Sequence, residues 1–293
     1  MAIYYNNSNG DILMKASKIL GILIIIALIL SIAIVGVNSF ILNKDKASGN
    51  TVSMIMKPDE IENITYADNN ETNISELYVM VNESNIRPTI NINIHQKVGA
   101  VKIEFADTDD IYNVTTSNSN NASTTIKHSQ TNETVTVDIT SKSAGNTIVL
   151  SNKYRYNINV ELLSGGINAE LSPNSQIDTM GLNITLGGAN INLNNAYINH
   201  LDNHVTVGGV NVNGIPHGYA HMDSEIKIGG LNLANNNQKV YVRSNIELGG
   251  YNAEGYQYNY FNGFNCLKGN AYDGSTEQFD ITSKIQIGGL NIR

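Results

Sequence analysis

Apolar and polar residues alternate along most of the chain after about residue 76. The pattern is clear in Thr89–Ile94, Val101–Phe105 and Thr134–Ile139. Strict alternation places all apolar side chains on one face of an extended segment, which is typical of a β-strand with one face buried. No segment in this part shows the 3.6-residue period of an amphipathic helix. We therefore expect an all-β protein from about residue 76 to the C-terminus.

One long apolar segment interrupts this pattern near the N-terminus, from Ile19 to Leu42, and it contains no charged residue. About 20 apolar residues span the hydrocarbon core as a helix, and a single segment in lipid satisfies its backbone only as a helix. A cleaved signal peptide is the alternative, but its apolar region normally has only ~7–15 residues. We expect an uncleaved transmembrane helix over 19–42, with the lipid bilayer as its partner.

The flanks of this segment leave its orientation open, because two lysines precede it and two follow it. The segment that follows is poor in charge and rich in Asn, Thr and Ser, which suits an exterior environment. We therefore expect a single-pass protein of the cell membrane, with residues 1–18 as a short cytoplasmic N-terminus and the C-terminal domain outside. Residues 43–75 are polar and have the composition of a stalk or linker.

A short unit of two glycines, an apolar residue and an asparagine recurs in the C-terminal half. Its first glycines are separated by 22, 21, 21, 20 and 39 residues. The last interval is close to two periods, and a degenerate copy at Phe261–Cys266 lies inside it. The first glycines of the six copies are Gly165, Gly187, Gly208, Gly229, Gly249 and Gly288.

Apolar positions alternate on both sides of each glycine pair but slip by one residue across it. Glycine at that slip permits a bulge or corner with a positive φ. A β-rich unit with this period predicts a single-stranded β-solenoid whose coils stack at ~4.8 Å. A leucine-rich repeat has a similar period, but its Leu-x-x-Leu-x-Leu frame is missing. We assign 76–160 to a membrane-proximal β region and 161–293 to the solenoid.

In such a stack, each repeated asparagine lies above another asparagine. Stacked amide side chains can form hydrogen bonds along the axis as a ladder. We therefore expect a structural role, without catalysis, for Asn168, Asn190, Asn211, Asn232, Asn252 and Asn291.

Two tripeptides, His200-Leu201-Asp202 and His221-Met222-Asp223, lie 21 residues apart and at the same distance before their glycine pairs. The stacking predicts His200 beside His221 and Asp202 beside Asp223, about 5 Å apart. Imidazoles and carboxylates at that separation are suited to a divalent metal. The alternative is a solvated face that has two histidines.

Four tyrosines and two phenylalanines lie between residues 251 and 264. Exposed aromatic rings on a rigid sheet can stack on sugars or contact proteins. They can equally close the end of the core, and packing is the interpretation that we favour.

The composition removes several classes of function. Of the 293 residues only 15% are charged, and the net charge is −8, so a nucleic-acid-binding face is not expected. The single cysteine, Cys266, excludes an intrachain disulfide and a cysteine zinc cluster. Nine Asn-x-Ser/Thr sequons, seven of them between Asn63 and Asn132, are compatible either with a glycoprotein or with the asparagine-rich composition alone.

The order of these features resembles the toast-rack and putative-adhesin single-sheet β-helix domains of microbial cell-envelope proteins. The resemblance rests on Val98–Ile103, on Asn157–Leu171 and on the Gly-Gly units, and it covers about Glu76 to Arg293. It implies a setting at the cell surface or envelope. The shared pattern is strand–glycine–strand, so it supplies no catalytic residues.

No arrangement typical of an enzyme is found, and no pair of acidic positions recurs as in a glycosidase groove. We expect a non-enzymatic protein without a cofactor, anchored at the cell surface in a structural or adhesive role. An envelope sensor or regulatory partner-binding protein is the alternative. The expected partners are surface glycans or envelope proteins. Self-association through an open edge at the terminal coil, Ile292-Arg293, is a further expectation.

Overall fold

The computed structural model describes residues 51–56, 89–117, 124–131, 134–234 and 239–293. The expected N-terminus (1–18) and transmembrane helix (19–42) lie outside these residues. No helix in the described ranges is both long and apolar enough to cross a bilayer.

Every regular element in the described residues is a strand, which confirms the all-β class. The strands are β1 (Thr51–Met56), β2 (Thr89–Ala106), β3 (Tyr112–Ser117), β4 (Thr124–Thr131), β5 (Thr134–Ser143), β6 (Gly145–Ser151), β7 (Arg155–Glu170), β8 (Gln176–Asn192), β9 (Tyr197–Asn213), β10 (Tyr219–Ala234), β11 (Val240–Ala253), β12 (Gln257–Phe261), β13 (Phe264–Lys268) and β14 (Gln278–Ile292).

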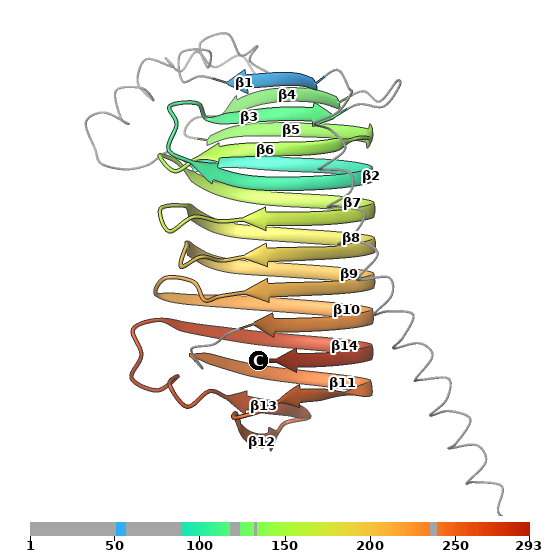
Figure 1. The fold of residues 1–293 in the computed structure, drawn as a ribbon, viewed down its shortest axis with the longest axis vertical. Helices are drawn as coiled ribbons and strands as arrows, with labels where there is room; N and C mark the ends of the chain where they lie inside the picture. The colour runs from blue at the N-terminus through green and yellow to red at the C-terminus, as the bar shows by residue number, and fades with distance from the viewer. Residues whose placement is uncertain (1–50, 57–88, 118–123, 132–133, 235–238) are drawn as a thin grey trace, which may run out of the picture.

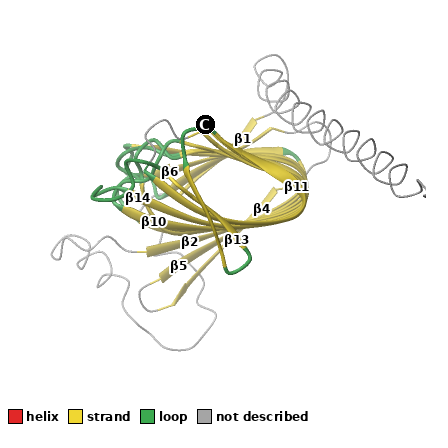
Figure 2. Cartoon of the chain, turned by 90° about the horizontal axis from the view of Figure 1, so that it is seen from below, coloured by secondary structure: helices red, strands yellow, loops and turns green. Residues whose placement is uncertain are grey.

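All these strands belong to one sheet, in the order β1-β3-β6-β2-β7-β8-β9-β10-β14-β11-β13-β12, with β5 also paired to β2 and β4 to β5. The long strands from β2 to β11 in this order pair in parallel. Figure 1 shows them as a regular stack. Seen along the stack, each long strand bends so that the sheet folds back on itself (Figure 2).

The bend lies at the glycine pair of each long strand. The first glycine has a positive φ in every layer, for example 144° at Gly208 and 146° at Gly229. Residues with a side chain rarely adopt this conformation. A Cβ on Gly208 would also lie 1.4 Å from the carbonyl oxygen of Gly187, and one on Gly229 would lie 1.4 Å from that of Gly208. A long strand therefore lies this close to the preceding layer only where its own corner residue is glycine; at Gly99, the neighbouring carbonyl oxygen belongs to Ala144.

The glycine column begins earlier than the exact repeats, at Gly99 of β2, which pairs in register with Gly165 of β7. The proposed boundary at 160/161 falls inside β7, which belongs to the same sheet on both sides of it. The sheet is therefore continuous across the proposed boundary. Within the expected stalk, Thr51–Met56 form β1 and pair with β3.

The last repeat does not follow the order of the sequence. Gly288 of β14 pairs with Gly229 of β10 on one side and with Gly249 of β11 on the other. The final strand is thus inserted between two strands that precede it in the chain (Figure 1). The open edge expected at Ile292-Arg293 is wrong, because β14 has a paired strand on both sides.

The degenerate copy at Phe261–Cys266 is also not a layer of the stack. It forms the turn of an antiparallel hairpin, β12–β13, and β13 pairs antiparallel with β11. The edge strand at this end of the sheet is therefore β12. The interval of 39 residues contains a hairpin and a return connection in place of an extra coil.

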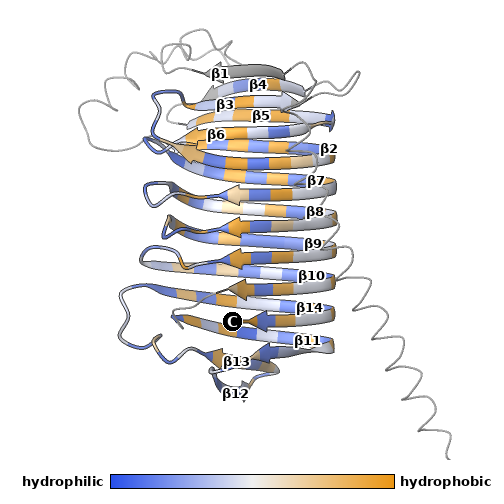
Figure 3. Cartoon of the chain, viewed as in Figure 1, coloured by the Kyte–Doolittle hydropathy of each residue, from blue (hydrophilic) through white to orange (hydrophobic). Residues whose placement is uncertain are grey.

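The core follows from the alternation. In β2, for instance, Ile90, Ile92 and Ile94 are each at most 1% exposed, whereas the residues between them are partly exposed. Figure 3 shows apolar and polar residues alternating along the strands. The parallel register places equivalent inward residues on top of one another, so one apolar core runs through the stack.

One inward column changes from apolar to polar along the stack. Leu182 is followed in register by Asn203, Ser224, Ser283 and Ser244. All four polar side chains are buried, and no hydrogen-bond partner for their polar atoms is found among the described residues. A buried polar group without a partner costs about 1–3 kcal/mol of stability.

Replacing Gly208 by Ala is expected to disrupt the stack. The positive φ alone costs of order 1–3 kcal/mol, and the overlap with the Gly187 carbonyl adds to this cost. We expect a large fall in melting temperature, measured by circular dichroism. Gly250→Ala is the matched control, since a Cβ there meets nothing within 4 Å. Equal melting temperatures for the two variants would contradict a stack governed by glycine contacts.

Replacing Ser283 by Ala is expected to raise the free energy of unfolding by about 1 kcal/mol, because it removes a buried hydroxyl without a partner. Ser175→Ala is the control, and it is expected to lower the free energy of unfolding. The Ser175 hydroxyl is equally buried but donates to the carbonyl oxygen of Ser172 at 2.7 Å. Chemical denaturation of both variants checks the prediction, and a loss of stability in Ser283→Ala would refute it.

Candidate functional site

The outward face of β9 and β10 gathers three histidines and three carboxylates. The parallel register sets His200 beside His221 and Asp202 beside Asp223, as their spacing predicts. The next outward pair along the strands is His204 beside Glu225. We call these six residues the histidine–acid face. They lie on regular strands within the stack, so the backbone spacing of the sheet sets their positions.

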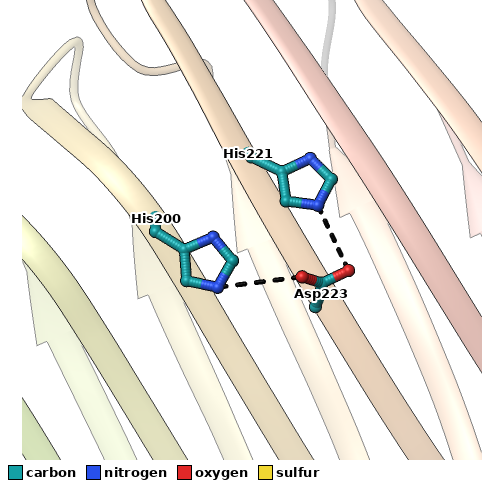
Figure 4. Close-up of side chains that lie close together, drawn as sticks. All are labelled: His200, His221 and Asp223. Carbon is teal, nitrogen blue, oxygen red and sulfur yellow. Dashed lines mark hydrogen bonds and ion pairs between the residues drawn. The ribbon is translucent and has the colours of Figure 1, made fainter.

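Three of the six point toward one another. His200 and His221 stack with ring centroids 5.5 Å apart and planes 18° apart. The Nε2 atom of His221 lies 3.2 Å from Oδ1 of Asp223, and Nε2 of His200 lies 3.7 Å from Oδ2 of the same carboxylate. Figure 4 shows both rings directing an edge toward Asp223. One ligand atom from each residue lies within 4.8 Å of the others.

The structure separates Asp202 from this triad. Its carboxylate lies 3.4 Å from Nδ1 of His204, whose Nε2 lies 3.7 Å from Glu225. His204 and Glu225 were missed in the sequence. Their signal was present, because each follows its aspartate by two residues and therefore faces the same side of a strand.

Asp280 of β14 lies in register beside His221 but has other partners. Its carboxylate accepts hydrogen bonds from the hydroxyls of Tyr219, at 3.2 Å, and Tyr272. Loss of solvation and these bonds to a carboxylate raise the pKa of both phenols above its usual value. The two tyrosines thus hold Asp280 outside the triad.

The repeated asparagines stack as columns, but their side chains bond in only part of the stack. Asn190 donates to Asn168 at 2.9 Å, Asn291 to Asn232 at 2.5 Å, and Asn252 to Asn291 at 3.1 Å. Asn190 also accepts a hydrogen bond at 3.1 Å, but its donor is Asn213, which lies two residues after the repeated Asn211. The geometry thus contains two short ladders separated at Asn211.

The aromatic residues of β12 are exposed, so the packing interpretation is wrong for them. Tyr258, Tyr260 and Phe261 are 54%, 62% and 63% exposed. Tyr258 also stacks on Tyr251 of β11, with ring centroids 5.7 Å apart and planes 14° apart. Partial desolvation and the Tyr258 hydroxyl raise the pKa of the Tyr251 phenol. Because β12 is an edge strand, no further layer within the described residues covers these four rings, which we call the aromatic tip.

Comparison with known proteins supports the fold. The chain is similar to the crystal structure of a putative cell adhesion protein from Clostridium sporogenes ATCC 15579, with a TM-score of 0.53 and 14% sequence identity. The alignment covers 84% of this chain and 99% of that one. No protein-family model matches the chain, and no curated protein matches it in sequence. At this identity the likeness concerns the fold alone.

Replacing Asn291 by Ala is expected to lower stability more than replacing Asn211. Asn291 both donates to Asn232 and accepts from Asn252, and each such bond contributes about 0.5–1.5 kcal/mol. We therefore expect Asn291→Ala to cost about 1–3 kcal/mol, measured by chemical denaturation. Asn211→Ala is the control, because Asn211 lies in the same column but between the two ladders. Equal losses would show that the amide bonds contribute little.

Proposed function

We propose that this chain is a membrane-anchored, cell-surface β-solenoid protein with a structural or adhesive role, and that it binds surface glycans through its aromatic tip. The stacked layers supply a stiff support. The name of the similar Clostridium sporogenes structure, a putative cell adhesion protein, favours the same role.

The observation that carries the proposal is the position of the aromatic tip in the sheet. β12 and β1 are the two ends of the strand order. The expected transmembrane helix ends at Leu42, nine positions before Thr51 of β1. Nine residue steps reach at most about 32 Å. The anchor therefore ties the β1 end to the membrane, which leaves the β12 end as the far end of the stack.

The chemistry of the tip suits a sugar. Stacked, exposed phenol rings offer flat faces to the apolar side of a pyranose. Polar groups lie among them, since the Tyr258 hydroxyl donates to Asn265 at 3.1 Å and Asn259 is exposed on the same strand. Exposed hydroxyl and amide groups can form hydrogen bonds with sugar hydroxyls, and a purely apolar protein interface would not need them.

The proposal predicts that the purified full-length protein binds particular glycans on an array and that Tyr258→Ala with Tyr260→Ala reduces binding at least about tenfold. Removing two stacking rings accounts for a loss of this size. Tyr219→Ala is the matched control, because Tyr219 is an equally exposed tyrosine (59%) on β10, away from the tip.

Protease applied to intact cells that display the protein should abolish binding of the same glycans. If the double variant binds glycans as the wild type does, the tip is not the contact surface. If the wild type binds no glycan but captures an envelope protein through β12, the role is partner binding in place of glycan adhesion.

A further inference from the structure

We propose that the histidine–acid face binds one divalent transition-metal ion of the Zn²⁺ type, held by the Nε2 atoms of His200 and His221 and by the carboxylate of Asp223. This inference is independent of the proposed adhesive function. It concerns a different part of the stack, in the middle layers β9 and β10.

The three donor atoms are close to the arrangement that such an ion requires. Zinc binds imidazole nitrogen and carboxylate oxygen at about 2.0–2.2 Å, so tetrahedral donors lie about 3.3 Å from one another. The distances from Asp223 to His221 and to His200 are 3.2 and 3.7 Å, and the largest separation among the donor atoms is below 4.8 Å. Small side-chain rotations would close the remaining gap.

The scaffold holds these donors in place. His200 and His221 are paired residues of adjacent parallel strands, and Asp223 lies two residues after His221 on the same strand face. The strands are flanked by β8 and β14, so neither is an edge of the sheet. Donors on paired inner strands require less ordering on binding than donors on loops.

Solvent reaches the triad, which gives an ion a route of entry. The side chains of His221, His200 and Asp223 are 26%, 36% and 48% exposed. Three protein ligands leave a fourth tetrahedral position open to solvent, for water or a donor from another molecule. The site therefore has the open form of a metal centre that can accept an external ligand.

The charges around the triad favour a cation. Asp202 lies in register beside Asp223, Asp280 beside His221, and Glu225 follows on the same face. Among the basic residues on this face, Lys284 lies in register beside Glu225, Lys227 follows Glu225 by two residues, and Arg243 donates a hydrogen bond to Thr282. The charged residues directly beside the triad in the register, Asp202 and Asp280, are thus both acidic.

Two imidazoles and one carboxylate select the class of metal. Calcium and magnesium prefer six or more oxygen ligands, whereas imidazole nitrogen suits Zn²⁺ and neighbouring transition metals. The proposal is therefore Zn²⁺ binding with little response to Ca²⁺ or Mg²⁺.

The test is isothermal titration of the purified full-length protein with ZnCl₂ at neutral pH. We expect one ion per chain, and a rise in melting temperature with Zn²⁺ because the ion binds the folded state. His221→Ala and Asp223→Asn should each weaken Zn²⁺ binding at least about tenfold and abolish the rise in melting temperature. Titration with Co²⁺ should give the strong visible absorption of tetrahedral coordination.

His204→Ala is the matched control, because His204 is an exposed imidazole on β9 that contacts Asp202 and Glu225 but lies outside the triad. It should retain wild-type affinity. All three substitutions are on the surface, so melting temperatures without metal should match the wild type. The proposal is overturned if the wild type does not bind Zn²⁺, if His221→Ala binds as tightly as the wild type, or if only His204→Ala loses binding.

Discussion

The close contact between the backbones of stacked glycines is the constraint on which the structure depends. In each layer the carbonyl oxygen of one glycine occupies the position that a Cβ on the next would need, as between Gly187 and Gly208. The same residues adopt a φ that other residues avoid. A slip that brought the residue before the glycine pair into this column, such as Val207, would place a side chain there, so the glycines set the corner and restrict the register.

That register determines which side chains meet. Equivalent residues of successive layers lie about 4.8 Å apart, so like lies beside like. This stacking of identical residues suits asparagine, because its side-chain amide can both donate and accept a hydrogen bond, as between Asn252 and Asn291. It also brings His200 beside His221, where two donors of one type can share an ion. In the core, the same rule aligns Ser224, Ser283 and Ser244 in one polar column.

The insertion of β14 shows the limit of a repeat as a guide to topology. Gly229, Gly249 and Gly288 belong to equivalent repeat units, so the sequence pattern does not specify which of them lie side by side. In the structure, Gly288 lies between the other two. The spatial order depends on the β12–β13 hairpin, which pairs with β11 and occupies the side where the next layer would stack. The chain then returns through residues 269–277 to the other side of β11.

The sequence by itself determined the all-β class, the glycine corner and the stacking of His200 on His221, because each follows from local periodicity and one repeat length. The tertiary structure decided the order of the last layers, the exposure of Tyr258 and Tyr260, and the separation of Asp202 from the triad. These features depend on contacts between residues distant in the chain and on side-chain orientation, about which a backbone period carries no information.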